Sequence, residues 1–175
     1  MWSLSETEIL LTIAELSVAF AGFASVASVL GRRFSQEDPR INAGRLLIML
    51  LVSLTATGLA LTPVIPMILD WPSRWVWGSS GALGLVVQAI VVSIVIRRVR
   101  QMMRYPGFNS RANAANFSLA VVCFLGLICS LLGIPAGRPF TAYLISLLSL
   151  LGVSGILFYR VIASLQKTDN SPAQE

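Results

Sequence analysis

Five long apolar stretches, separated by short polar links, occupy most of this 175-residue chain. Each is close to the roughly 20 apolar residues with which a helix crosses the roughly 30 Å hydrocarbon core of a bilayer. Only 12% of the residues are charged, whereas a soluble domain has about twice that fraction. We therefore predict an all-α integral membrane bundle of five transmembrane helices, with spans at about 9–30, 46–69, 76–96, 114–133 and 140–157.

The spans and their links are expected to form one transmembrane domain, residues 1–167, in which the third and fifth helices extend into the cytoplasm. Residues 168–175 form a polar C-terminal tail. No other stretch is long enough for a separate soluble domain, since such domains have roughly 50 residues or more. The first span is not expected to be a cleaved leader, because its N-terminal flank is acidic and two arginines directly follow it.

Basic residues are distributed unequally over the two sides of the predicted bundle. Of 13 lysines and arginines, only Arg74 and Arg138 lie in the second-to-third and fourth-to-fifth links. Because positive residues remain preferentially in the cytoplasm, we expect the N-terminus outside and the C-terminus in the cytoplasm of a plasma membrane, such as a bacterial inner membrane. The net charge of +5 then indicates contact with anionic headgroups and not with nucleic acid.

Glu15 is the one ionisable residue between Ile9 and Leu30. Placing a charge near mid-membrane costs about 2.5–3.5 kcal/mol on insertion scales, so an acid there indicates a functional site. Much of the surrounding segment is Gly, Ala or Ser, which allows other helices to approach closely. Steps of three and four place one stripe of residues along this helix: Glu8, Thr12, Glu15, Ala19 and Gly22.

Two interpretations of this stripe are open, and both place the first helix in the interior. In the first, several protomers arrange the stripe around an axis, and a ring of Glu15 side chains selects cations. In the second, Glu15 is protonated or hydrogen-bonded to Ser, Thr or Gln88 within one bundle. Elsewhere, Gln88, Asn113 and Asn116 are expected to form hydrogen bonds between helices.

Arginines gather where the helices are expected to leave the membrane on the cytoplasmic side. They set the topology, bind anionic headgroups, or bind the acidic surface of a soluble protein partner. The residues concerned are Arg32, Arg33, Arg97, Arg98, Arg100 and Arg104.

Pro63 and Pro66 lie in the last third of the second span. Because proline removes a backbone donor, we expect a kink there, with Thr62 as a partner for the freed carbonyl groups. The kink acts either as a static bend or as a gate or hinge. Three tryptophans in and after the next turn are expected to lie at the membrane interface: Trp71, Trp75 and Trp77.

Signatures of catalysis are missing from the sequence. The chain has no histidine, and its two cysteines, Cys123 and Cys129, lie six positions apart in one span, where a helix points them in different directions. No metal-ligand set, no nucleophile with a base and no phosphate-binding GxxxxGK loop is recognisable. We predict that the protein is not an enzyme and uses no metal and no cofactor.

The pattern IAELxVAFAGFxSV…LGRR, followed by four further spans, resembles small uncharacterised bacterial multi-pass membrane proteins over most of the chain, a resemblance that implies no activity. Residues 22–29 also resemble part of the pore helix of Orai-type calcium channels. Here Glu15 precedes the segment and the arginines follow it, the reverse of that family's order. This resemblance implies that conduction is the activity to test.

Together these features predict a homo-oligomeric channel whose first helix lines a cation path. The alternative is a non-conducting membrane scaffold or sensor subunit that recruits a cytoplasmic protein partner through its arginine-rich links.

Overall fold

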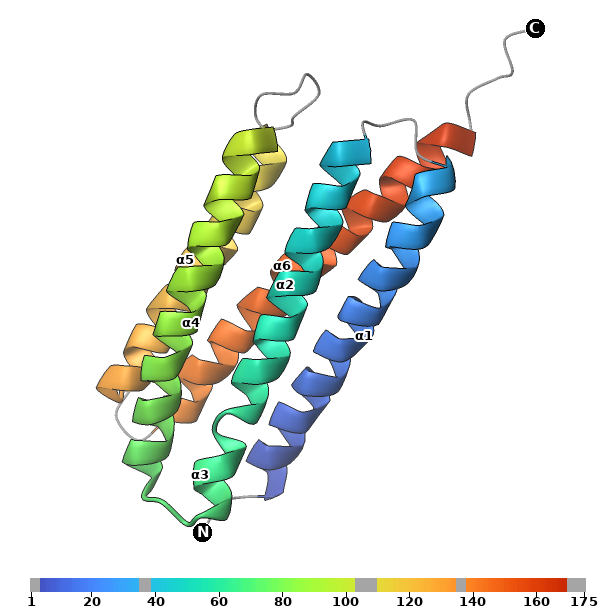
Figure 1. The fold of residues 1–175 in the computed structure, drawn as a ribbon. Helices are drawn as coiled ribbons and strands as arrows, with labels where there is room; N and C mark the ends of the chain where they lie inside the picture. Colours follow the sequence, from blue (N-terminus) through green and yellow to red (C-terminus); the bar gives the residue numbers. More distant parts are fainter. Residues whose placement is uncertain (1–3, 35–38, 103–109, 135–137, 170–175) are drawn as a thin grey trace, which may run out of the picture.

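Long helices make up nearly all of the structure, a computed structural model that describes residues 4–34, 39–102, 110–134 and 138–169 (Figure 1). Within those ranges there is no strand. Five candidate spans are long and apolar enough to cross a membrane, and α2 and α3 together form one of them. The all-α fold is therefore confirmed, with five helical segments that are long and apolar enough to cross a membrane. The helices are α1 (Leu4–Phe34), α2 (Pro39–Leu61), α3 (Val64–Ile68), α4 (Ser73–Met102), α5 (Ser110–Leu132) and α6 (Pro139–Asp169).

The bundle has α6 at its centre, with α1 along one edge and α4 and α5 along the other (Figure 1). Within the described part of the chain, α6 packs on all four other long helices, whereas α1 packs mainly on α2 and α6. The C-terminal ends of α1, α4 and α6 lie at the end of the bundle where α2 and α5 begin (Figure 1). The arginines at that end whose side chains the structure describes are Arg45, Arg97, Arg98, Arg100 and Arg160.

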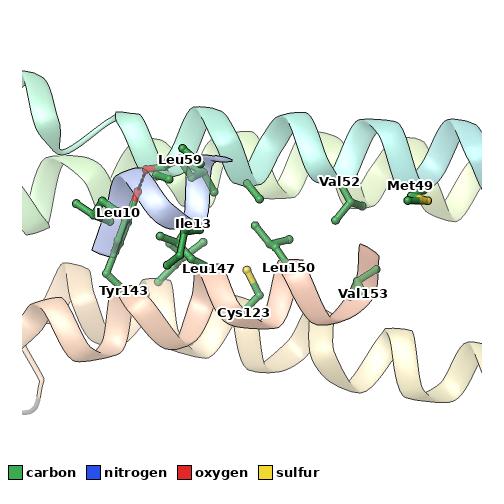
Figure 2. Packing of buried hydrophobic residues seen from close by; sticks show 14 of the residues in the cluster. Leu10, Ile13, Met49, Val52, Leu59, Cys123, Tyr143, Leu147, Leu150 and Val153 are labelled. Atoms are coloured by element: carbon green, nitrogen blue, oxygen red, sulfur yellow. Dashed lines mark hydrogen bonds between the residues drawn. The ribbon is translucent and has the colours of Figure 1, made fainter. Parts of the chain in front are cut away.

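The core follows the facing sides of α2 and α6 (Figure 2). One buried cluster contains Met49 and Leu59 of α2, Leu147 and Leu150 of α6, and Leu10 of α1. Lipid tails are as apolar as these side chains, so their burial alone does not hold membrane helices together. Close packing and hydrogen bonds between helices must supply the stability.

Two glycines allow α5 to approach its neighbours closely. A Cβ atom at Gly126 would collide with Ser146 Oγ on α6 and lie 2.8 Å from the carbonyl oxygen of Ala142. A Cβ atom at Gly81 on α4 would lie 3.1 Å from the backbone nitrogen of Leu131. Such approach of backbones is the packing that small residues permit in membranes.

Replacing Gly126 by alanine is expected to push α5 away from α6 and to lower the free energy of unfolding by about 1–3 kcal/mol, as overpacking does. Thermal unfolding in detergent measures this change. Gly58→Ala is the matched control, because nothing lies within 4 Å of a Cβ atom there. Equal midpoints for the two variants would contradict the close α5–α6 contact.

Left-handed residues end the helices at two turns on the same end of the bundle. Asp70 has φ 52° and Gly133 has φ 69°. After them, the Trp71 N–H donates to the Pro66 carbonyl at 3.1 Å, and the Ile134 N–H donates to the Cys129 carbonyl at 2.8 Å. These bonds satisfy carbonyl groups that a helix end leaves free. The turns predicted after the second and fourth spans therefore begin here.

Several details differ from the sequence-based expectations. The helix α5 begins at Ser110, before the predicted start of its span, and α6 continues as far as Asp169. Of the three tryptophans expected at the membrane interface, Trp71 and Trp75 are exposed, but Trp77 is buried, with its ring centroid 5.6 Å from that of Tyr143. Trp77 follows Trp75 by two positions, and two positions on a helix place side chains on different faces.

Candidate functional site

The predicted stripe on α1 forms one continuous face of that helix. The other face is packed on α2 and α6 and contains Leu10, Ile13 and Ala24, which are buried. All five stripe residues are exposed, and nothing lies within 4 Å of a Cβ atom built at the last of them. These residues are Glu8, Thr12, Glu15, Ala19 and Gly22.

Glu15 thus points away from the rest of its own chain. Gln88, one of the partners considered for it, is instead buried in α4, where its Oε1 atom accepts no hydrogen bond from the described residues. The interpretation in which Glu15 is hydrogen-bonded to Gln88 within one bundle is therefore wrong. The expectation that α1 is interior is also wrong for a single chain, since α1 forms an edge.

The hydroxyl groups on α1 add little polarity to the exposed face that contains Glu15. Thr12 Oγ1 donates to the Glu8 carbonyl at 2.9 Å, and Ser17 Oγ, on the buried side, donates to the Ile13 carbonyl at 2.7 Å. Hydroxyls bonded in this way to their own helix leave the helix surface less polar. Glu15 is consequently the main polar group at mid-length of the outer face of α1.

At the two prolines the structure has a break and not only a kink. The helix α2 ends at Leu61, and α3 resumes at Val64. Pro63 has no N–H, so the Leu59 carbonyl loses its helical donor. The Tyr143 hydroxyl of α6 donates to that carbonyl at 2.6 Å, as Figure 2 shows.

Thr62, the predicted partner for the freed carbonyl groups, is not the donor to the Leu59 carbonyl. Its N–H and its Oγ1 both donate to the Gly58 carbonyl, at 3.0 and 2.8 Å. The partner that the sequence did not reveal is Tyr143. A tyrosine in another span can be chosen only when the pairing of α2 with α6 is known.

Three of the predicted cytoplasmic arginines, Arg97, Arg98 and Arg100, are exposed near the C-terminal end of α4. The side chains of Arg32 and Arg33, and the whole of Arg104, lie outside what the structure describes. Long cationic side chains at such a helix end reach the headgroup layer.

Buried polar groups inside the bundle only partly match the predicted hydrogen bonding between helices. Ser53 Oγ of α2 donates to Ser154 Oγ of α6 at 3.1 Å. Gln88 Oε1 and Asn116 Oδ1, expected to bond between helices, have no partner among the described residues, and Ser80 Oγ has none either. The side chain of Asn113 lies outside the description.

Within the described ranges, no three His, Cys, Asp or Glu residues lie close enough together to hold a metal ion. Cys123 and Cys129 are free thiols.

Comparisons with protein-family models, with curated proteins and with solved structures found no match to this chain.

Proposed function

We propose that the protein is a homo-oligomeric membrane channel in which α1 of each protomer lines a cation path. The observation that carries this proposal is the exposed position of Glu15 on the outer face of α1. In a lone bundle this carboxyl group would face hydrocarbon, at a cost of about 2.5–3.5 kcal/mol if it were charged. Around an axis shared by several copies, the same face lines an aqueous lumen and that cost disappears.

The order of side chains along the stripe supports conduction of cations. With the N-terminus outside, Glu8 lies at the outer mouth, Glu15 lies deeper, and Ala19 and Gly22 follow towards the cytoplasm. Rings of carboxylates attract and select cations, and small residues beyond them leave room for a hydrated path. Exposed arginines at the cytoplasmic end of α4 contact anionic headgroups in this arrangement.

The oligomeric state tests the proposal most directly. Native mass spectrometry in a mild detergent or nanodisc is expected to show one closed assembly of four or more copies. A monomer or a simple dimer would exclude a path lined by α1, because too few helices would surround it.

The exposed Arg97, Arg98 and Arg100 favour the scaffold as the second candidate, which requires no such ring.

Disulfide cross-linking tests whether α1 lies at the axis. Ala19→Cys is expected to yield cross-linked dimers under oxidation, because its position faces the same position of the neighbouring copies. Ala89→Cys is the matched control, since it is exposed near mid-length of α4 on the opposite edge of the bundle. The unsubstituted chain supplies the baseline for its own two free thiols. Cross-linking at position 89 but not at 19 would place a different helix at the axis.

A further inference from the structure

Three helices meet tightly beside Gly84 of α4. A Cβ atom at this position would lie 2.9 Å from Leu127 Cδ2 of α5 and 3.4 Å from Leu59 Cδ2 of α2. Gly84, Leu59 and Leu127 therefore define one layer in which α2, α4 and α5 face one another. Because α4 runs antiparallel to α2 and α5 (Figure 1), a step of four residues along each helix leads to the next layer.

Helical periodicity places three side chains able to form hydrogen bonds in that next layer, which we call the polar layer: Thr55, Gln88 and Cys123. All three are buried, with exposed fractions of 8%, 2% and 0%. Gln88 lies near the middle of α4, 15 positions after Ser73 and 14 before Met102. The polar layer therefore lies near the middle of the third predicted span and is enclosed by the protein.

The hydrogen bonding of the polar layer is incomplete in one specific respect. Gln88 Oε1 accepts no hydrogen bond from any described residue. Thr55 Oγ1 donates to the Leu51 carbonyl at 2.7 Å, which leaves its lone pairs able to accept. Cys123 is a free thiol, whose S–H is a weak donor. Besides the amide N–H groups of Gln88, the layer thus offers two acceptors and one weak donor.

We propose that the polar layer binds an ordered water molecule between α2, α4 and α5. Water matches the three groups, because its two O–H bonds can be donated to Gln88 Oε1 and Thr55 Oγ1 while its oxygen accepts the S–H of Cys123. About three hydrogen bonds are typical of a buried water. The molecule must be small, since the adjacent layer is tightly packed. This site lies within one chain and does not depend on the proposed channel.

Solid-state NMR on the wild-type protein in bilayers tests the site directly. With 15N-glutamine labelling, the side-chain amide of Gln88 is expected to receive magnetisation from water early. Gln101, exposed near the end of α4, is the positive control, and the spectrum of Gln88→Met assigns the Gln88 signal by its loss. No transfer to Gln88 at mixing times long enough for Gln101 would overturn the proposal.

The unfolding temperature of Gln88→Met gives a second test through the sign of its change. If water satisfies Gln88, the variant loses a hydrogen bond and its unfolding midpoint is expected to fall by about 2–4 °C. If Oε1 has no partner, removing it relieves the protein of an unsatisfied buried acceptor and the midpoint rises, which would overturn the proposal. Ser93→Ala, an exposed hydroxyl bonded to its own helix at the Ala89 carbonyl, is expected to cause no shift.

Discussion

If α1 lines the proposed cation path, replacing Glu15 by glutamine is expected to reduce the preference for cations over chloride about tenfold, with assembly unchanged. Glutamine keeps the size of the side chain and removes its charge. A unit charge about 4 Å from an ion at an effective dielectric constant of about 20 contributes roughly 4 kcal/mol. Water in the lumen screens part of this Coulomb energy. A tenfold change in preference corresponds to roughly 1.4 kcal/mol, which is about a third of the unscreened value.

Reversal potentials in planar bilayers under a KCl gradient measure the preference for cations. Glu15→Asp retains the charge and is expected to keep most of the preference for cations. Glu8→Gln, at the outer mouth, should have a smaller effect, because salt screens a solvated charge within about 10 Å at 0.1 M. If the reversal potential is the same for the wild type and for Glu15→Gln, then Glu15 does not form the selective ring.

Replacing Tyr143 by phenylalanine is expected to lower the free energy of unfolding by about 1–3 kcal/mol, since it leaves the buried Leu59 carbonyl without a donor. The ring itself remains, so its contact with Trp77, whose centroid is 5.6 Å away, is preserved. Thermal or SDS-induced unfolding in detergent measures the loss. Tyr159→Phe on the same helix is the control, because Tyr159 is 72% exposed.

A double-mutant cycle with Pro63 tests whether Tyr143→Phe lowers stability because the Leu59 carbonyl loses its donor. Pro63→Ala restores a backbone N–H four residues after Leu59, where a helix would bond it to the Leu59 carbonyl. In that background, Tyr143→Phe is expected to cost less than it does alone, so that the two effects are not additive. Additive effects would show that the hydroxyl of Tyr143 stabilises the protein in some other way.

The number of long apolar helices and their approximate limits could be predicted, because a membrane helix must satisfy its own backbone over a fixed length. The common face of Glu8, Glu15 and Gly22 could also be predicted, since it follows from helical periodicity alone. The direction of that face could not. Lipid and protein core are both apolar, so the hydropathy of α1 does not distinguish the side that meets α2 from the side that faces outwards.

The contacts that the sequence did not reveal all depend on which helices are neighbours. Tyr143 and Trp77 lie near the same end of the bundle as the exposed tryptophans, and only the packing of α6 on α2 and α4 places them inside. Gln88 is of a residue type that often joins helices by hydrogen bonds, but its Oε1 atom has no partner among the described residues. Pairing of helices is set by local shape, which a hydropathy pattern does not contain.

The central position of α6 has a consequence for the order in which the protein is assembled during synthesis. This helix follows the other five in the chain, yet it carries the Tyr143 hydroxyl, the Ser154 hydroxyl and the surface that receives Gly126. Until α6 is inserted, the Leu59 carbonyl and the Ser53 hydroxyl of α2 lack these partners in a lipid environment. The preceding helices are therefore expected to form an incomplete bundle until α6 packs on them.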